Sequence, residues 1–211
     1  MRHIAECIAR NHRLFPEAPG VADATRRLSH GQLAERAWAI GRGLRAIGVQ
    51  TGDSVGVLSG NTVFSAETFL GVVAAGAAYV PYIWRWTTDE LVHGINETGA
   101  KVVLVAQGFE EAIQAAIDSR QLERDLVVIV EGPQLEAFVR PGGPLDIDYD
   151  PEDTACVLFT GGTTGFSKGV MLSSRACLSN AYQEITDCRV GATPGDRCVI
   201  STPMFHSAAL L

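Results

Sequence analysis

Residues 51–81, TGDSVGVLSGNTVFSAETFLGVVAAGAAYVP, contain the pattern that decides the fold. The apolar run at 54–58 predicts a short strand, and Asn61 can cap the helix that follows it. Gly76 is expected to end that helix, and residues 77–81 predict the next strand. A strand, a helix and a second strand in this order are typical of parallel pairing.

Helix-start signals flank this unit on both sides. Ser29 with Gln32 three residues later forms a capping-box pattern, and apolar residues then recur at helical spacing until Gly48. Thr87 with Glu90 repeats the pattern and predicts a second helix of the same kind. Both helices are expected to pack one face against a neighbouring layer.

The alternation of strands and helices continues downstream. Residues 101–105 predict an almost wholly apolar strand, residues 109–117 a helix, and residues 126–130 another buried strand. Apolar strands separated by amphipathic helices indicate a parallel sheet covered on both faces. The expected fold class is therefore α/β, with parallel-sheet layers flanked by helices.

A segment rich in Pro, Gly and Asp, residues 140–153, is the best candidate for a boundary. We expect an α/β subdomain at 1–150, followed at 151–211 by the start of a second α/β subdomain. The elements expected beyond the boundary are strands at 155–159, 170–172 and 197–201, a Gly/Thr loop at 160–169, and a helix capped by Ser173 or Ser174.

Composition and charge exclude several classes of protein. Seventeen Lys and Arg against 24 Asp and Glu give a net charge of −7, so the chain lacks the positive field that attracts nucleic acid. The longest uncharged stretch, residues 68–84, is interrupted by Gly71, Gly76 and Pro81. It predicts a buried helix leading into a buried strand, and no membrane span.

The cysteines and the N-terminal residues indicate in which cellular compartment the protein is expected. The chain has 5 cysteines, an odd number without a C-x-x-C pair, and they sit in apolar segments as reduced, packed cysteines do. The opening residues, MRHIAECIARNHRLF, carry scattered charges and no apolar core of a secretory signal. A cytoplasmic location is expected.

The expected strand at 155–159 is followed directly by Thr160-Gly161-Gly162-Thr163-Thr164-Gly165-Phe166-Ser167-Lys168-Gly169. Glycines let the backbone approach a ligand closely and turn its N–H groups toward an anion. The threonine hydroxyls add donors, and Lys168 adds a cation on a flexible stem. The combination suits a polyphosphate.

Other phosphate-binding motifs do not fit this loop. A Walker A loop would need Gly in place of Ser167 and Ser or Thr in place of Gly169. The glycine spacing does not give G-x-G-x-x-G either. On composition alone, the alternative is a flexible Gly/Thr hairpin loop with a solvated lysine.

The segment FTGGTTGFSKGV resembles the phosphate-binding signature T-[SG]-G-[ST]-T-G-x-P-K-G of the adenylate-forming (AMP-binding) superfamily. Ser167 departs from the proline of that signature, which leaves the loop less rigid. Upstream, LSHGQLAERAWAIGRGLRAIGVQTGDSVGVLSGN is similar to the opening helix, turn and strand of the same superfamily and to the Asn that follows them. The resemblance covers nearly the whole chain.

Two further segments resemble the acyl-CoA synthetase branch. PYIWRWTTDEL, residues 81–91, is similar to the P-x-x-W-R-x-T-x-x-E-L stretch frequent in those enzymes. Pro203-Met204-Phe205-His206 resembles a P-x-F-H element that lies beside the acyl and adenylate site. Without the resemblance, His206 would be interpreted as a loop histidine satisfied locally. Trp84 and Trp86 are expected to be packing residues.

The resemblance implies a ligase that activates a carboxylic acid with ATP and Mg²⁺ to an acyl-adenylate and transfers the acyl group to coenzyme A. It implies catalytic roles for Lys168 and for His206, which would border the acyl carbonyl. The residues that would bind the ATP phosphates are Thr160, Gly161, Gly162, Thr163, Thr164, Gly165 and Lys168. No metal ligand is identified among these residues.

The superfamily's adenine-binding, magnesium-binding and catalytic C-terminal segments would lie beyond residue 211. We therefore expect this chain to be the N-terminal portion of a longer enzyme, inactive alone. Apolar surface around Val199, Ile200, Leu210 and Leu211 would then be exposed and favour self-association.

Other functions remain open at this stage. A stand-alone module could bind a nucleotide or phosphate without catalysis, or an unrelated hydrolase or NTPase could match the loop by chance.

Overall fold

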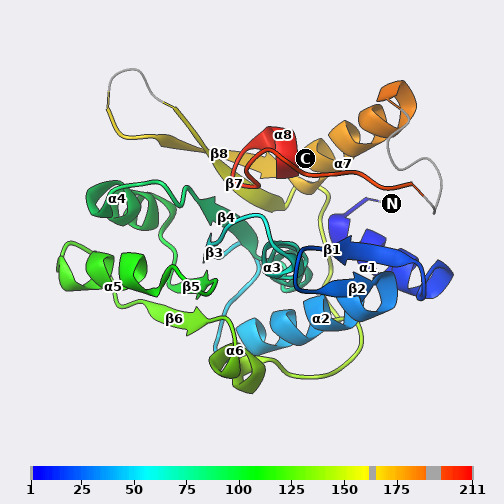
Figure 1. The fold of residues 1–211 in the computed structure, drawn as a ribbon, viewed down its shortest axis with the longest axis horizontal. Helices are drawn as coiled ribbons and strands as arrows, with labels where there is room; N and C mark the ends of the chain where they lie inside the picture. Colours follow the sequence, from blue (N-terminus) through cyan, green and yellow to red (C-terminus); the bar gives the residue numbers. More distant parts are fainter. Residues whose placement is uncertain (1, 162–164, 189–195, 211) are drawn as a thin grey trace.

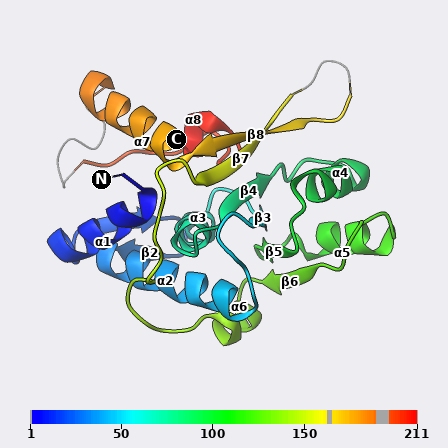
Figure 2. The ribbon, with the colours of Figure 1, turned by 180° about the vertical axis from the view of Figure 1, so that it is seen from behind.

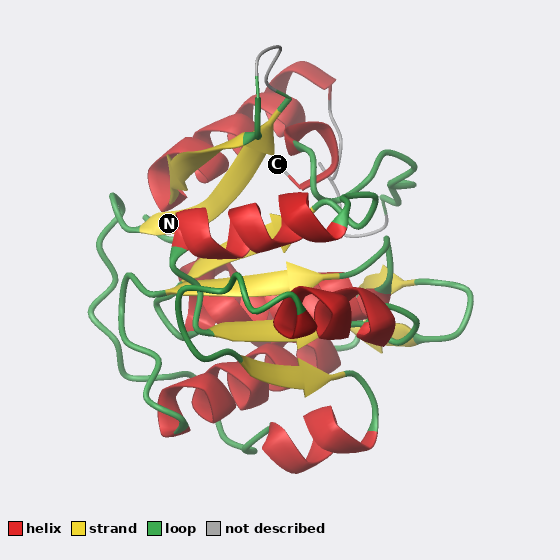
Figure 3. Ribbon diagram, turned by 90° about the vertical axis from the view of Figure 1, so that its left-hand side faces the viewer, coloured by secondary structure: helices red, strands yellow, loops and turns green. Residues whose placement is uncertain are grey.

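The computed structural model describes residues 2–161, 165–188 and 196–210. A six-stranded sheet in the order β6-β5-β3-β4-β7-β8 forms its centre. The first five strands in this order are parallel, and β8 is antiparallel to β7. The strands are β3 (Ser54–Leu58), β4 (Ala78–Tyr82), β5 (Val102–Val105), β6 (Val127–Val130), β7 (Thr154–Thr160) and β8 (Lys168–Ser173). Figure 1 shows this order, and Figure 3 shows helices around the strands.

Helices cover both faces of the sheet. On one face lie α2 (His30–Ala46) and α3 (Val63–Ala74), with α1 (Ile4–Leu14) packed against both. On the other face lie α4 (Thr88–Thr98) and α5 (Glu110–Asp118), which appear together at one side of Figure 1 and of Figure 2. The remaining elements are a hairpin of β1 (Pro19–Ala22) and β2 (Arg27–Ser29), α6 (Pro133–Phe138), α7 (Ser174–Gln183) with a π-helical turn η1 (Glu184–Cys188), and α8 (Ser207–Leu210).

The core explains why the strands are continuously apolar. In β5, Val102 and Leu104 face the α2 and α3 side, while Val103 and Val105 face α4 and α5. All four side chains are buried, because a strand inside a parallel sheet meets helices on both faces. The predicted α/β fold with a parallel sheet covered on both faces is therefore confirmed.

The predicted helix starts are confirmed in detail. Ser29 Oγ accepts a hydrogen bond from the Gln32 N–H at 3.2 Å, and Gln32 Oε1 accepts one from the Ser29 N–H at 2.9 Å. Thr87 and Glu90 make the same reciprocal pair at the start of α4. Gly99 ends α4 with a left-handed φ of 64°, which glycine adopts without steric cost.

The prediction that Asn61 caps α3 is wrong. The N-cap residue is Thr62, whose side chain makes no capping hydrogen bond. The N–H of Val63 instead donates to Asp23 Oδ2 at 2.8 Å, from the turn of the β1–β2 hairpin. A distant carboxylate therefore satisfies the helix end that the local sequence was expected to satisfy.

Two predicted strands need correction. The strand at 126–130 is present as β6 but is not fully buried, because β6 pairs only with β5 and Val127 is 48% exposed. Residues 197–201 do not form a strand. Their Ile200 carbonyl accepts a hydrogen bond from the Asn61 side chain, so it is not part of a strand ladder.

Residues 140–150 of the proposed boundary belong to no helix or strand, and residues 151–153 form a turn that leads into β7. Tyr149 in this segment donates a hydrogen bond to the Ala74 carbonyl at 2.7 Å, and its ring stacks on His3. β7 then pairs with β4 in the same sheet. A division into subdomains near residue 150 stays a proposal.

The described cysteines Cys7, Cys156, Cys177 and Cys198 are free thiols. Cys156 and Cys177 are buried as expected, but Cys198 is exposed because its segment is not part of the sheet. No helix in the described part of the chain is long and apolar enough to cross a membrane. The cytoplasmic location stays a prediction.

Candidate phosphate-binding site

The candidate site lies at the carboxyl ends of the parallel strands. Asn61 follows β3, Trp84 follows β4, and the Gly/Thr segment begins directly after β7. In open α/β sheets, ligands bind outside the carboxyl ends of the strands, because loops and helix N-termini converge there. The position of the predicted phosphate-binding segment agrees with this rule.

Thr160 and Lys168 are brought together as a cross-strand pair at the end of the β7–β8 hairpin. Thr160 Oγ1 donates to the Lys168 carbonyl at 3.4 Å. Lys168 is therefore the first residue of β8, whereas the sequence predicted a loop over 160–169; strand pairing continues further than the apolar run. Directly paired residues project from the same face of a hairpin, so the hydroxyl and the ammonium lie on one side.

The three described glycines of the hairpin occupy positions that differ in packing and in backbone conformation. A Cβ on Gly169 would lie 2.8 Å from Val157 Cγ1, so close packing requires glycine there. Gly165 has a φ of 141°, which other residues rarely adopt. A Cβ on Gly161 would meet nothing within 4 Å, so its space is open to a ligand. Gly162, Thr163 and Thr164 lie outside the described residues.

A histidine of α4, His93, contacts the turn of the hairpin at Phe166 and Ser167. His93 Nε2 lies 3.3 Å from the Ser167 carbonyl, which can only accept the hydrogen bond, so Nε2 is the donor. The His93 ring also stacks on Phe166 with centroids 4.5 Å apart. Sequence reasoning missed His93, because helical spacing alone does not tell which residue the fold places beside the loop.

Residues 200–206 bring His206 to the same edge of the sheet. The Asn61 side chain bonds this segment, and the buried Phe205 ring packs edge-on against Trp84 at 6.4 Å. The His206 side chain is exposed, and the backbone N–H of His206 donates to the Pro203 carbonyl at 3.0 Å. His206 is therefore exposed on a segment that is anchored by the Asn61 hydrogen bonds and by the packing of Phe205 on Trp84.

Trp86 is a packing residue, as predicted, whereas Trp84 makes ring contacts but remains 37% exposed. Trp84 contacts Phe205 and Phe109, with the Arg85 guanidinium 4.6 Å above its ring. Trp86 packs edge-on against Phe159 at 4.8 Å. These rings support the ends of β4 and β7, which carry the two parts of the candidate site.

The two predicted catalytic residues are not in contact. Between His206 and Lys168, no hydrogen bond or ion pair is found among the described residues. Lys168 pairs with Thr160 at the carboxyl end of β7, and His206 follows Phe205, which packs on Trp84 after the carboxyl end of the neighbouring strand β4. A substrate that bridges them would have to span the carboxyl ends of both strands.

Charge at the hairpin is available for a ligand. Within the described part of the chain, Lys168 makes no salt bridge and its side chain is exposed. That part also contains no group of three His, Cys, Asp or Glu side chains able to hold a metal. The exposed Lys168 ammonium therefore fits an anionic ligand.

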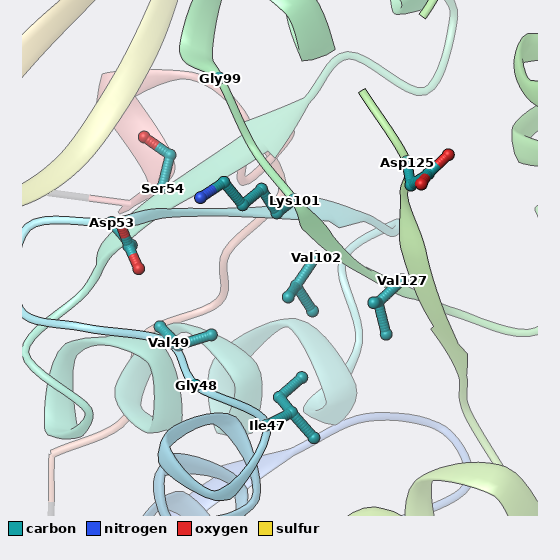
Figure 4. Close-up of a pocket in the computed structure, with 10 residues that line it drawn as sticks. All are labelled: Ile47, Gly48, Val49, Asp53, Ser54, Gly99, Lys101, Val102, Asp125 and Val127. Carbon is teal, nitrogen blue, oxygen red and sulfur yellow. The ribbon is translucent and has the colours of Figure 1, made fainter. Parts of the chain in front are cut away.

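A cavity of about 250 Å³ lies at the opposite edge of the sheet. Figure 4 shows Lys101, Asp53 and Asp125 around it, at the amino ends of β5, β3 and β6. Because it is separated from the Gly/Thr hairpin by the length of the strands, it is not part of the candidate site.

The fold is an open α/β sheet whose ligand site is expected at the carboxyl ends of its parallel strands, where the Gly/Thr hairpin begins. The chain belongs to the AMP-binding enzyme family, whose profile matches residues 8–211. The family resemblance inferred from the sequence is confirmed. A chance match by an unrelated hydrolase or NTPase is thereby excluded.

The relatives of this chain include proteins with different named activities. The chain is 29% identical to feruloyl-CoA synthase of Amycolatopsis sp over 95% of its length, and 29% identical to tyrocidine synthase 1 of Brevibacillus parabrevis over 93%. The solved structure of ATP-bound MatB from Rhodopseudomonas palustris superposes with a TM-score of 0.77 at 27% identity, over 98% of this chain. The chain spans 39%, 17% and 42% of these relatives, respectively.

Proposed function

We propose that this chain is the N-terminal part of an acyl-CoA synthetase, which activates a carboxylic acid with ATP and transfers the acyl group to coenzyme A. Family membership supports adenylate formation, and the similarity to feruloyl-CoA synthase supports the coenzyme A branch. The sequence PYIWRWTTDEL favours the same branch.

The observation that carries the proposal is the hairpin end formed by Thr160, Gly161 and Lys168. One hydroxyl and one exposed ammonium, which makes no salt bridge with any described residue, share a face there, beside a glycine with open space for a ligand. Such an arrangement suits the β- and γ-phosphates of ATP, because it offers donors and a positive charge without a competing carboxylate. MatB from Rhodopseudomonas palustris has been solved with ATP bound, which supports ATP as the ligand of this fold.

In the proposed reaction, a carboxylate oxygen of the acid attacks the α-phosphorus of ATP, and the bond to the β-phosphate oxygen breaks. Charge accumulates on the departing pyrophosphate, where the Lys168 ammonium and the Thr160 hydroxyl would stabilise it. His206 would border the acyl carbonyl. The thiol of coenzyme A then displaces AMP from the acyl carbon, and its proton leaves to solvent.

A second candidate is an adenylation domain of a peptide synthetase. It is supported by the similarity to tyrocidine synthase 1, at the same identity as to feruloyl-CoA synthase. The first half-reaction is common to both candidates. They differ in the thiol that receives the acyl group.

The test is ATP–pyrophosphate exchange by the complete protein that carries these residues, with a panel of aromatic, fatty and amino acids. We expect exchange that depends on a carboxylic acid, and a thioester product when coenzyme A is added. Exchange with an amino acid and no thioester with coenzyme A would favour the second candidate. No exchange with any acid would contradict adenylate formation and favour a binding module without catalysis.

A further inference from the structure

The carboxamide of Asn61 ties three backbone groups of a segment far along the chain. Asn61 Nδ2 donates to the Ile200 carbonyl at 3.2 Å and to the Thr202 carbonyl at 2.6 Å. Asn61 Oδ1 accepts the Met204 N–H at 2.9 Å. Both N–H donors and the carbonyl of the amide are therefore used on this one segment.

Asn61 is attached to a rigid part of the fold. It follows β3, whose Val57 and Leu58 side chains are buried between the two helix layers. Two residues later, the first turn of α3 is fixed by the hydrogen bond from the Val63 N–H to Asp23. The Asn61 side chain therefore fixes the segment it binds relative to the sheet.

Before Phe205, the described part of the segment is largely exposed, and the Thr202 hydroxyl donates to the Ala208 carbonyl at 3.5 Å. Val199 is 88% exposed and Ile200 46% exposed, and residues 196–201 belong to no helix or strand. The next anchor along the chain is the buried Phe205 ring against Trp84, and His206 follows directly. The location of His206 over the sheet edge is thus set by Asn61 and Phe205 together.

We infer that Asn61 is a positioning residue for His206: it holds residues 200–204 so that His206 stands at the carboxyl ends of β3 and β4. This role rests on the proposed function, in which His206 borders the acyl carbonyl. Asn suits the position because it both donates and accepts. An aspartate of the same size would place an oxygen against two carbonyl oxygens.

The contact can be tested without any activity. In Asn61→Ala, we expect the Met204 amide to exchange its hydrogen with deuterium at least about fivefold faster than in the parent, since one hydrogen bond is worth about 1 kcal/mol. Asn96→Ala is the matched control, because Asn96 binds the Gln121 carbonyl and the Glu123 N–H at the other edge of the sheet. Unchanged Met204 exchange in Asn61→Ala would overturn the inference.

The positioning role is tested by a double-mutant cycle in acid-dependent ATP–pyrophosphate exchange. We expect Asn61→Ala to lower kcat/KM for the acid about tenfold in the parent, and less than twofold in the His206→Ala background. Equal losses in both backgrounds would mean that Asn61 acts independently of His206, and would overturn the role. Asn61→Asp should behave as Asn61→Ala does, which guards against a folding defect of one variant.

The two proposals can fail separately. If the parent exchanges no pyrophosphate with any acid, the proposed function fails, and the catalytic meaning of Asn61 fails with it. Met204 hydrogen exchange would still respond to Asn61→Ala in that case, which identifies the function as the wrong premise. If exchange occurs but the cycle is additive, only the role of Asn61 is wrong.

Discussion

At the residue scale, the carboxylate of Asp23 shows how one side chain fixes an element from outside it. Burial raises the pKa of Asp23, but hydrogen bonds from the N–H groups of Val63, Thr25 and Arg26 and from the Thr25 hydroxyl outweigh this effect. They hold its pKa well below the ordinary value of 3.8. The charged form is therefore the one that stabilises the fold.

Replacing this carboxylate should weaken the protein in a pH-dependent way. Asp23→Ala should lower the free energy of unfolding by about 1–2 kcal/mol at neutral pH, the range for a lost helix cap. Because the pKa in the folded state is below that of the unfolded chain, the contribution is complete above about pH 4. It is lost as the pH falls through the folded-state value.

Urea unfolding at several pH values measures this difference. The gap between the parent and Asp23→Ala should shrink in acid, whereas Asp148→Ala, at an exposed aspartate, should show little effect at any pH. A gap that stays constant from pH 7 to pH 3 would contradict the assignment of Asp23.

At the element scale, α4 supports the hairpin that carries the candidate site. The signature-like loop has Ser167 where the related pattern has proline, so its backbone is less restricted. The His93 ring on Phe166 and its hydrogen bond to the Ser167 carbonyl supply a restraint from the neighbouring helix instead. The contacts from His93 therefore restrict the backbone at Ser167, as a proline at that position would.

Removing this restraint should weaken ATP binding without unfolding the protein. In His93→Ala, we expect KM for ATP in pyrophosphate exchange to rise about fivefold, from the loss of about 1 kcal/mol of stacking and hydrogen bonding. The melting temperature should change little. His12→Ala is the control, because His12 packs on Trp38 of α2, away from the site. An unchanged KM for ATP in His93→Ala would show that α4 does not order the hairpin.

Elements whose signals are local could be predicted from the sequence. The capping boxes at Ser29 and Thr87 join residues three positions apart, so a short stretch of sequence is enough to predict them. The cap on Val63, the clamp by His93 and the anchor at Asn61 join residues separated by 40, 74 and 141 positions. No local pattern carries such contacts, which is why Asn61 was assigned the wrong partner. Apolar periodicity also could not tell the edge strand β6 from an interior one.

At the scale of the whole molecule, apolar surface gathers in the C-terminal part. Most large apolar side chains exposed in the described part lie on the β7–β8 hairpin, α7, η1 and the segment after them: Phe166, Val170, Met171, Tyr182, Ile185, Val199 and Ile200. The expected exposure of Val199 and Ile200 is thus confirmed. Leu210 is instead partly buried against the core, because α8 folds back onto it, and Leu211 lies outside the described residues.

These exposed side chains should make the 211-residue chain self-associate, since exposed apolar surface favours contact between copies. Sedimentation velocity should show a rising weight-average mass with concentration. Replacing Met171 and Val199 by serine should reduce the effect, while Val127→Ser, at the other sheet edge, should not. A monodisperse monomer at every concentration would contradict the prediction.

We propose that the β7–β8 hairpin binds the phosphates of ATP through Lys168. The most direct measurement compares Lys168→Ala with Lys101→Ala, the other lysine of the chain, in acid-dependent ATP–pyrophosphate exchange by the complete protein. We expect Lys168→Ala to lower the exchange rate about 10²-fold or more, because its contact strengthens as pyrophosphate departs. Lys101→Ala, at the opposite cavity, should exchange at the parent rate, and Thr164→Ala should lose less than Lys168→Ala. If Lys168→Ala keeps its melting temperature and exchanges pyrophosphate at the parent rate, the hairpin is a solvated turn and the assignment is wrong.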